Sequence, residues 1–256
     1  MAEHRKILYK TQDGIARVTL NRPDKRNALD SELINGIQDA MSATALHAKC
    51  RAVLLTGAGK DFCSGADLSG LEKTAQTGVL ENMDDARNMA ELFLTMRHHP
   101  RPIVAAVQGR ALAGGCGLAT ACDIILASES AQFGYPEVNI GFVPAMVMAI
   151  LRRSVSEKAA FELVASGDVI SAMRARELGL IHQVFPDEKF SAEVDAYVSR
   201  LAAKSSSALT LTKRLLYQMD AASFEAALEA GVQTNAIARM TEDCKRGVER
   251  FLKKGS

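Results

Sequence analysis

The distribution of strand-like and helical runs constrains the fold of this chain more than any other feature. Short apolar runs alternate with helical patterns as far as Pro186. From Lys189 onwards nearly every stretch has a helical pattern and is rich in Ala, Leu, Glu and Lys. Strands that alternate with helices are typical of an α/β core. The sequence therefore predicts an α/β core over residues 1–188, followed by a helical region over residues 189–256.

Turn signals and capping residues place several individual elements. Asp13-Gly14 predicts the turn of an opening hairpin, and Asp30 predicts the N-cap of the first long helix. Ser154 and Glu157 have the spacing of a capping box for a later helix. The other predicted elements are strands at Ile7–Lys10, Ile15–Leu20, Ala52–Thr56, Ile103–Val107, Asp123–Ala127 and Gln132–Phe133, and helices from about Glu81 to His98 and from Gly114.

Composition and charge exclude several classes of function. The 256 residues are 48% apolar and 24% charged, with a formal net charge of +1, as in an ordinary globular protein. This near-neutral balance argues against nucleic acid or membrane as a partner. The most apolar run, Ile140–Leu151, is too short to span a bilayer, and the start of the chain lacks the apolar core of a signal peptide. We therefore expect a cytoplasmic protein, with the mitochondrial matrix as the alternative if a presequence has been removed.

The cysteines and histidines do not form a metal or disulfide pattern. The five cysteines are odd in number and none of them has a CxxC spacing, so we expect reduced thiols. His98 and His99 are adjacent, and adjacent side chains on a helix diverge, which does not suit metal ligation. The sequence predicts no metal site.

Three separate segments together predict a site that polarises a carbonyl group. Gly114-Gly115 follow a strand and open a helix, where unpaired backbone N–H groups and the positive end of the helix dipole are available. Ala66 offers a second glycine-flanked N–H. Glu137 follows Pro136, and its apolar neighbours Phe133, Val138, Ile140 and Phe142 predict a desolvated carboxylate with a raised pKa. Two N–H donors and one acid suit an oxyanion hole with a general base.

These segments, GRALAGGCGLATACD, AQFGYPEVNIGFVPA and LLTGAGKDFCSGADLSGL, resemble the crotonase family of enoyl-CoA hydratases and isomerases. The resemblance includes LNRPDKRNALD and GVERFLKKGS, so it covers nearly the whole chain. It implies a crotonase/ClpP-like spiral of ββα units whose C-terminal helices build a homotrimer or a dimer of trimers. It also implies an acyl-CoA substrate, with coenzyme A as part of the substrate and no separate cofactor.

The same resemblance implies a role for individual residues. The N–H groups of Ala66 and Gly114 hold the thioester oxygen, and Glu137 is the catalytic acid and base. The residues expected to bind coenzyme A are Lys25, Arg26, Ala28, Ser64, Gly65, Ala66, Asp67, Leu68, Gly114, Phe251 and Lys254. Phe251 and Lys254 would close over the ligand, often from a neighbouring subunit.

One departure from the family pattern leaves the reaction open. Gly117 stands where hydratases of this family usually carry a first glutamate. Hydration of 2-trans-enoyl-CoA to 3-hydroxyacyl-CoA, as in fatty acid metabolism, is the first expectation. Δ3–Δ2 enoyl-CoA isomerisation is the alternative, because it needs only one carboxylate. A catalytically weak homologue that binds CoA or RNA is the alternative from another class.

Overall fold

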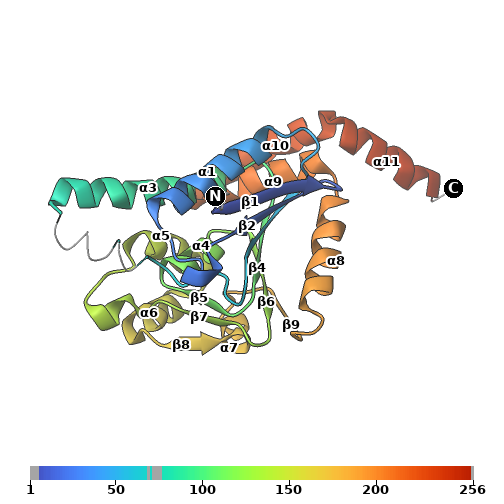
Figure 1. Ribbon diagram of the computed structural model, residues 1–256. Coiled ribbons are helices and arrows are strands. Elements are labelled where there is room, and N and C mark those ends of the chain that lie inside the picture. The colour runs from blue at the N-terminus through green and yellow to red at the C-terminus, as the bar shows by residue number, and fades with distance from the viewer. Residues whose placement is uncertain (1–5, 68–69, 71–76, 255–256) are drawn as a thin grey trace.

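The larger of two sheets has six strands in the order β1-β2-β3-β4-β6-β9 (Figure 1). The computed structural model describes residues 6–67, 70 and 77–254. β1 and β2 form the predicted antiparallel hairpin, and every other pair in this sheet is parallel. The strands are β1 Ile7–Gln12, β2 Ile15–Leu20, β3 Ala52–Gly57, β4 Ile103–Val107, β6 Ile124–Ser128 and β9 Gln183–Phe185.

The smaller sheet consists of three strands in the order β5-β7-β8. β5 (Arg110–Leu112) runs parallel to β7 (Gln132–Gly134), and β7 runs antiparallel to β8 (Val169–Ser171). The register pairs Leu112 with Gly134, so β5 and β7 end side by side. The residues that follow these two strands are therefore brought together, as at the carboxyl edge of other parallel sheets.

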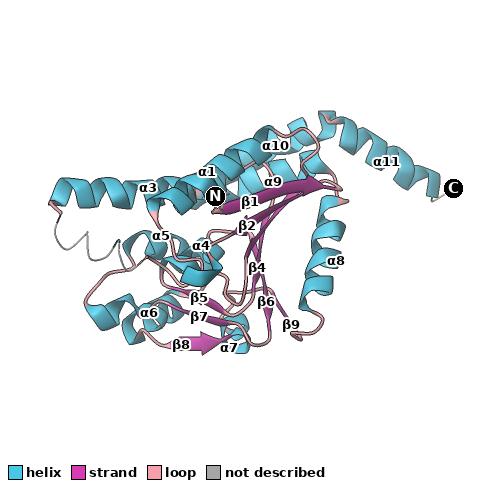
Figure 2. Ribbon diagram, in the orientation of Figure 1, coloured by secondary structure: helices cyan, strands magenta, loops and turns pink. Residues whose placement is uncertain are grey.

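Helices cover the larger sheet on both faces (Figure 2). α8 packs on one face of the sheet through Val194, Val198 and Ala202. Together with this face, α8 forms a second hydrophobic core, separate from the main core. The other face carries the main core, to which α1, α3, α4, α5 and α6 contribute. The helices are α1 Ser31–Leu46, α3 Val79–His98, α4 Gly114–Thr120, α5 Ala145–Ser154, α6 Glu157–Ser166, α7 Ala172–Glu177, α8 Phe190–Ala202, α9 Ser206–Gln218, α10 Phe224–Met240 and α11 Glu242–Lys254, with short 3-10 turns η1 Pro23–Lys25, η2 Pro136–Ile140 and η3 Met219–Ala221.

Local capping chemistry was predicted correctly at one helix and wrongly at another. Asp30 caps α1, because its carboxylate accepts a hydrogen bond from the Leu33 amide at 2.8 Å. The predicted capping box of Ser154 and Glu157 is wrong. Ser154 is the last residue of α5, where its hydroxyl donates to the carbonyl of Ile150 at 3.1 Å. Ser156 caps α6 instead, since a residue inside a helix cannot adopt the extended backbone of an N-cap.

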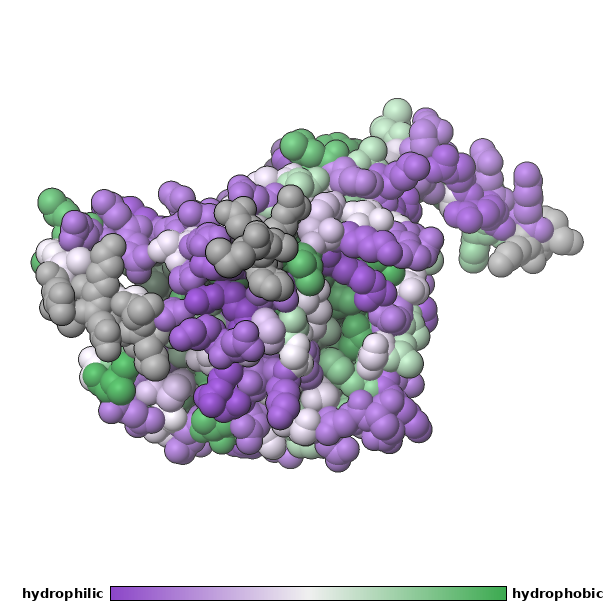
Figure 3. All heavy atoms as spheres, in the orientation of Figure 1, coloured by the Kyte–Doolittle hydropathy of each residue, from purple (hydrophilic) through white to green (hydrophobic). Residues whose placement is uncertain are grey.

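The C-terminal helices leave much apolar surface exposed. α10 has no buried residue, and α11 projects away from the rest of the chain (Figure 1). Hydrophobic side chains gather along the upper edge of the molecule, where α1 and α10 lie (Figure 3). Within the described residues, no helix has the length and apolar character needed to cross a membrane.

Candidate active site

Gly114 and Glu137 follow the two parallel strands that end side by side. Gly114 opens α4 just after β5, and Glu137 lies in η2 just after β7. A backbone hydrogen bond from Ala113 to the carbonyl of Gly134, 2.8 Å long, joins the two strand ends. The structure thus brings together the helix start and the carboxylate that the sequence placed about twenty residues apart.

The start of α4 is held in a strained conformation. Ala113 has φ +51° and ψ −130°, a region that costs a residue with a Cβ about 1–3 kcal/mol. A Cβ at Gly115 would lie 2.3 Å from the carbonyl oxygen of Cys63, so this glycine is required for packing. A Cβ at Gly114 would meet only flexible side-chain ends, Met89 at 3.3 Å and Leu29 at 3.5 Å. Of the two glycines, Gly114 is therefore the less tightly enclosed.

The loop that carries Ala66 lies against the start of α4. Leu29 donates to the carbonyl of Gly65 and accepts from the amide of Asp67, at 2.7 and 2.9 Å. Gly65 has φ +98°, and a Cβ on it would lie 3.7 Å from the amide nitrogen of Gly114. Among the described residues, neither the Ala66 amide nor the Gly114 amide has a hydrogen-bond acceptor. Two unpaired donors on adjacent segments are the arrangement of an oxyanion hole.

Arg22 clamps this loop, a role that the sequence did not predict. One end of its guanidinium donates to the carbonyl of Ala28 and lies 3.2 Å from the Asp30 carboxylate. The other end binds the Asp67 carboxylate at 2.8 Å. Asp67 is therefore an anchor for the residues around Ala66, and its side chain is occupied by Arg22.

Glu137 is a buried acid, and one oxygen of its carboxylate lacks a hydrogen-bond partner among the described residues. Its side chain is 9% exposed, and its Oε2 is buried with no hydrogen-bond partner among the described residues. Burial raises the pKa of this carboxyl above its ordinary value. Pro136 begins η2, and the carbonyl of Glu137 accepts from the Phe142 amide at 3.0 Å, which fixes the backbone. A buried carboxyl with a raised pKa and an oxygen that lacks a partner is a candidate for a functional role.

The apolar neighbours of Glu137 correspond only in part to the sequence prediction. Phe133 is fully buried, whereas Val138, Ile140 and Phe142 are 43%, 70% and 48% exposed in the single chain. The carboxylate is desolvated even though these three side chains face outwards. Val138 and Ile140 belong to η2 itself, and Phe142 follows its C-cap Gly141, which has φ +73°.

The two thiols near the site remain neutral. Burial raises the pKa of Cys63 to about 12 and that of Cys116 to about 11. The thiolate is the nucleophilic form of cysteine, so neither residue is suited to covalent catalysis at neutral pH. The charge of Glu137 adds to the rise in the pKa of Cys116, after burial as the main cause.

The expected coenzyme A residues lie in two separate parts of the chain, around the Ala66 loop and on α11. Lys25, Arg26 and Ala28 lie beside the Ala66 loop, since the carbonyl of Arg26 accepts from the Ser64 amide at 3.0 Å. Lys25 and Arg26 are exposed and free to contact a ligand. Phe251 and Lys254 lie on α11, far from this loop in the same chain, and Phe251 is 78% exposed (Figure 1). Leu68 lies outside the described residues.

Comparison with known proteins identifies the family. Residues 10–256 match the family model described as enoyl-CoA hydratase/isomerase. The chain belongs to this family, within the crotonase superfamily. The crotonase fold that the sequence predicted is confirmed by a solved enoyl-CoA hydratase of Mycobacterium smegmatis, with a TM-score of 0.93, 31% identity and coverage of 97% of this chain and 96% of the other.

Two curated members of the enoyl-CoA hydratase/isomerase family are similar along nearly their whole length. A Thermus thermophilus protein named "Putative enoyl-CoA hydratase" is 40% identical over 94% of this chain and 95% of its own. The 2,3-dehydroadipyl-CoA hydratase of Escherichia coli is 32% identical over 97% of this chain and 96% of its own. These relatives support a crotonase-type CoA-thioester hydratase/isomerase.

Proposed function

We propose that this chain hydrates 2-trans-enoyl-CoA thioesters to 3-hydroxyacyl-CoA, with Glu137 as the only acid and base. The observation that carries the proposal is the buried Glu137 carboxylate after β7, whose Oε2 has no hydrogen-bond partner among the described residues. It is accompanied by the Gly114 amide after β5 and the Ala66 amide on the adjacent loop, neither of which has an acceptor in the described part of the chain. The names of the Thermus and Escherichia coli relatives support hydration.

The proposed reaction uses these groups in two steps. Glu137 removes a proton from water as the hydroxyl oxygen bonds to C3 and the electron pair of the double bond moves towards the thioester oxygen. The amides of Ala66 and Gly114 stabilise the resulting enolate, and each such donor typically contributes about 3 kcal/mol. Glu137 then returns the proton to C2. A raised pKa suits this cycle because the carboxyl must both accept and donate a proton.

Δ3–Δ2 isomerisation is the second candidate, and the surroundings of Gly117 favour it. In that reaction Glu137 removes a proton from C2 and returns it to C4, and no water takes part. Gly117 is buried, and no side chain there can hold a water molecule. The same enolate and the same two amides serve both reactions.

Assembly and location belong to the same proposal. The exposed apolar face of α10 and the projecting α11 support a homotrimer or a dimer of trimers. A neighbouring subunit would then bring its Phe251 and Lys254 to the coenzyme A site. The resemblance to enzymes of fatty acid metabolism supports a cytoplasmic location or, after removal of a presequence, the mitochondrial matrix.

Turnover by the purified protein tests the reaction and the role of Glu137. We expect hydration of crotonyl-CoA to exceed isomerisation of 3-hexenoyl-CoA, and Glu137→Gln to lower turnover by at least about a hundredfold with CoA-thioester binding retained. Glu129→Gln is the matched control, because Glu129 is an exposed glutamate before the same short strand. Activity of Glu137→Gln within about tenfold of the parent would contradict its role. Binding without turnover of either substrate would favour the catalytically weak homologue.

A further inference from the structure

The space in front of Gly117 is filled by two apolar side chains. Gly117 lies one turn after Gly114 in α4. A Cβ at Gly117 would lie 2.5 Å from Cγ2 of Val147 in α5 and 3.4 Å from Cζ of Phe93 in α3. Val147 is 4% exposed and Phe93 is 7% exposed, so both are fixed by their surroundings. Any side chain at position 117 must displace Val147.

This apolar wall limits how water can be held in the space before Gly117. A buried water molecule needs two to four polar partners. Val147 and Phe93 offer none, and the neighbouring Cys116 thiol is neutral. Val147 and Phe93 therefore give a water molecule no polar side-chain partner in the space before Gly117. Proton transfer between carbon atoms by Glu137 has no such requirement.

We infer that Val147 is a specificity-determining residue, which limits hydration relative to isomerisation by keeping polar groups and water out of the space before Gly117. The inference rests on the proposed CoA-thioester function. Val147 acts here by occupying volume and does not touch the reacting atoms. Removing two of its methyl groups, together with a new carboxylate at position 117, should therefore move the reaction towards hydration.

The experiment compares Val147→Ala, Gly117→Glu and the double variant, with Val164→Ala as the control. Val164 is a core valine of α6, 7% exposed, outside the wall. Each preparation is assayed for crotonyl-CoA hydration, 3-hexenoyl-CoA isomerisation and thermal melting. The ratio of the two activities is the main measurement, because loss of folded protein lowers both activities equally and leaves the ratio unchanged.

We expect Gly117→Glu alone to melt at a lower temperature than the parent, because its side chain meets Val147. The double variant should recover part of this loss and raise the ratio of hydration to isomerisation by about tenfold or more, as a change of a few buried atoms can. Val147→Ala should raise the ratio less. Val164→Ala should lower the melting temperature with the ratio unchanged.

Two results would overturn the inference while the proposed function stands. The first is that the parent is active and the double variant is stable, but both have the same ratio of hydration to isomerisation. The second is that the melting-temperature shift of the double variant equals the sum of the shifts of Gly117→Glu and Val147→Ala. Contact between positions 117 and 147 requires that the two substitutions be coupled. A parent that turns over neither substrate contradicts the proposed function instead, and the melting data then decide the steric role of Val147 separately.

Discussion

The buried carboxylate of Glu137 couples the stability of the protein to pH. Burial raises the pKa of Glu137 in the folded state above its ordinary value of 4.5 in the unfolded chain. Between these two values the folded protein binds a proton that the unfolded chain has lost. Stability contributed by this group is therefore complete below the unfolded pKa and is lost as the pH rises through the folded pKa.

Glu137→Gln should remove this pH dependence. We expect the variant to be more stable than the parent at neutral pH, and the difference to vanish as the pH falls towards 4.5. Urea unfolding of the parent, Glu137→Gln and Glu129→Gln across pH 4 to 8 measures the effect. Parallel stability curves for the parent and Glu137→Gln would show that the carboxyl is not desolvated.

Arg22 is the residue that holds the Ala66 loop in position. Its guanidinium contacts Ala28, Asp30 and Asp67 at once, a geometry that the single ammonium of lysine cannot reproduce. We expect Arg22→Lys to lower kcat by about tenfold or more while KM changes less, because a displaced oxyanion donor affects the transition state most. Arg17→Lys is the control, since Arg17 pairs with Asp195 on the exposed surface. Equal kcat values for both variants would contradict the positioning role.

At the scale of elements, α9 is fastened to the sheet by a buried ion pair. The Lys213 ammonium lies 2.7 Å from the Asp123 carboxylate and donates to the carbonyls of Met96 and Arg101. The Tyr217 hydroxyl donates to the same carboxylate at 2.5 Å. Burial lowers the pKa of Lys213, although the charge of Asp123 opposes this shift. The helix is therefore held at the start of β6, because Asp123 directly precedes this strand.

Lys213→Met should loosen this attachment. Removing one partner of a buried pair typically costs about 3–5 kcal/mol, because the remaining charge stays buried without compensation. The exposed neighbour Arg214→Met is the control and should change the unfolding free energy little. Urea denaturation monitored by circular dichroism measures both. A Lys213→Met protein as stable as the control would show that the pair is replaceable by apolar packing.

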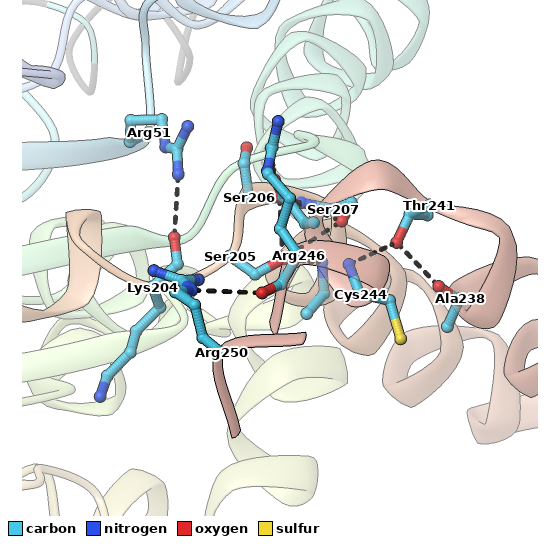
Figure 4. A network of polar contacts seen from close by, with 12 residues as sticks. Arg51, Lys204, Ser205, Ser206, Ser207, Ala238, Thr241, Cys244, Arg246 and Arg250 are labelled. Atoms are coloured by element: carbon cyan, nitrogen blue, oxygen red, sulfur yellow. Dashed lines mark hydrogen bonds and ion pairs between the residues drawn. The ribbon is translucent and has the colours of Figure 1, made fainter. Parts of the chain in front are cut away.

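At the scale of the whole molecule, α10 and α11 are only weakly integrated into the single chain. α11 is attached through the Asp243 carboxylate, which accepts from Ser205 and Ser207 at the start of α9. Figure 4 shows these two serines beside Arg246 of α11. The exposed apolar side chains on these two helices are Phe224, Leu228, Val232, Ile237, Met240, Val248, Phe251 and Leu252. Apolar surface of this extent is typical of an interface between protein chains.

We expect light scattering at micromolar concentration to give a mass of three or six chains. Phe224→Asp combined with Leu228→Asp should shift the mass towards a single chain, because charged side chains do not bury at an interface core. Glu225→Lys, an exposed change on the same helix, is the control. A clean monomer of the parent would refute the predicted assembly.

The sequence by itself determined the features that depend on neighbouring residues. The opening hairpin, the Asp30 cap and the strand at Ile103–Val107 follow from turn chemistry, capping and apolar runs, and all are present. β5, β8 and β9 were not predicted, because three residues give little periodic pattern. The equally short β7 was predicted as Gln132–Phe133. The domain boundary near residue 188 stays a prediction, although α8 packs directly on the sheet.

Only the tertiary structure decided which distant groups meet. The sequence named Glu137, Gly114 and Ala66 through a family resemblance, but their proximity arises from the pairing of β5 with β7 and of Cys63, on the Ala66 loop, with Ala111 in β5. The Arg22 clamp and the contact of Val147 with position 117 join segments far apart in the chain. No local pattern encodes such contacts, because burial and packing depend on every segment that fills the same space. That is why the sequence indicated the chemistry of Glu137, whereas the packing around Gly117 could be seen only in the folded molecule.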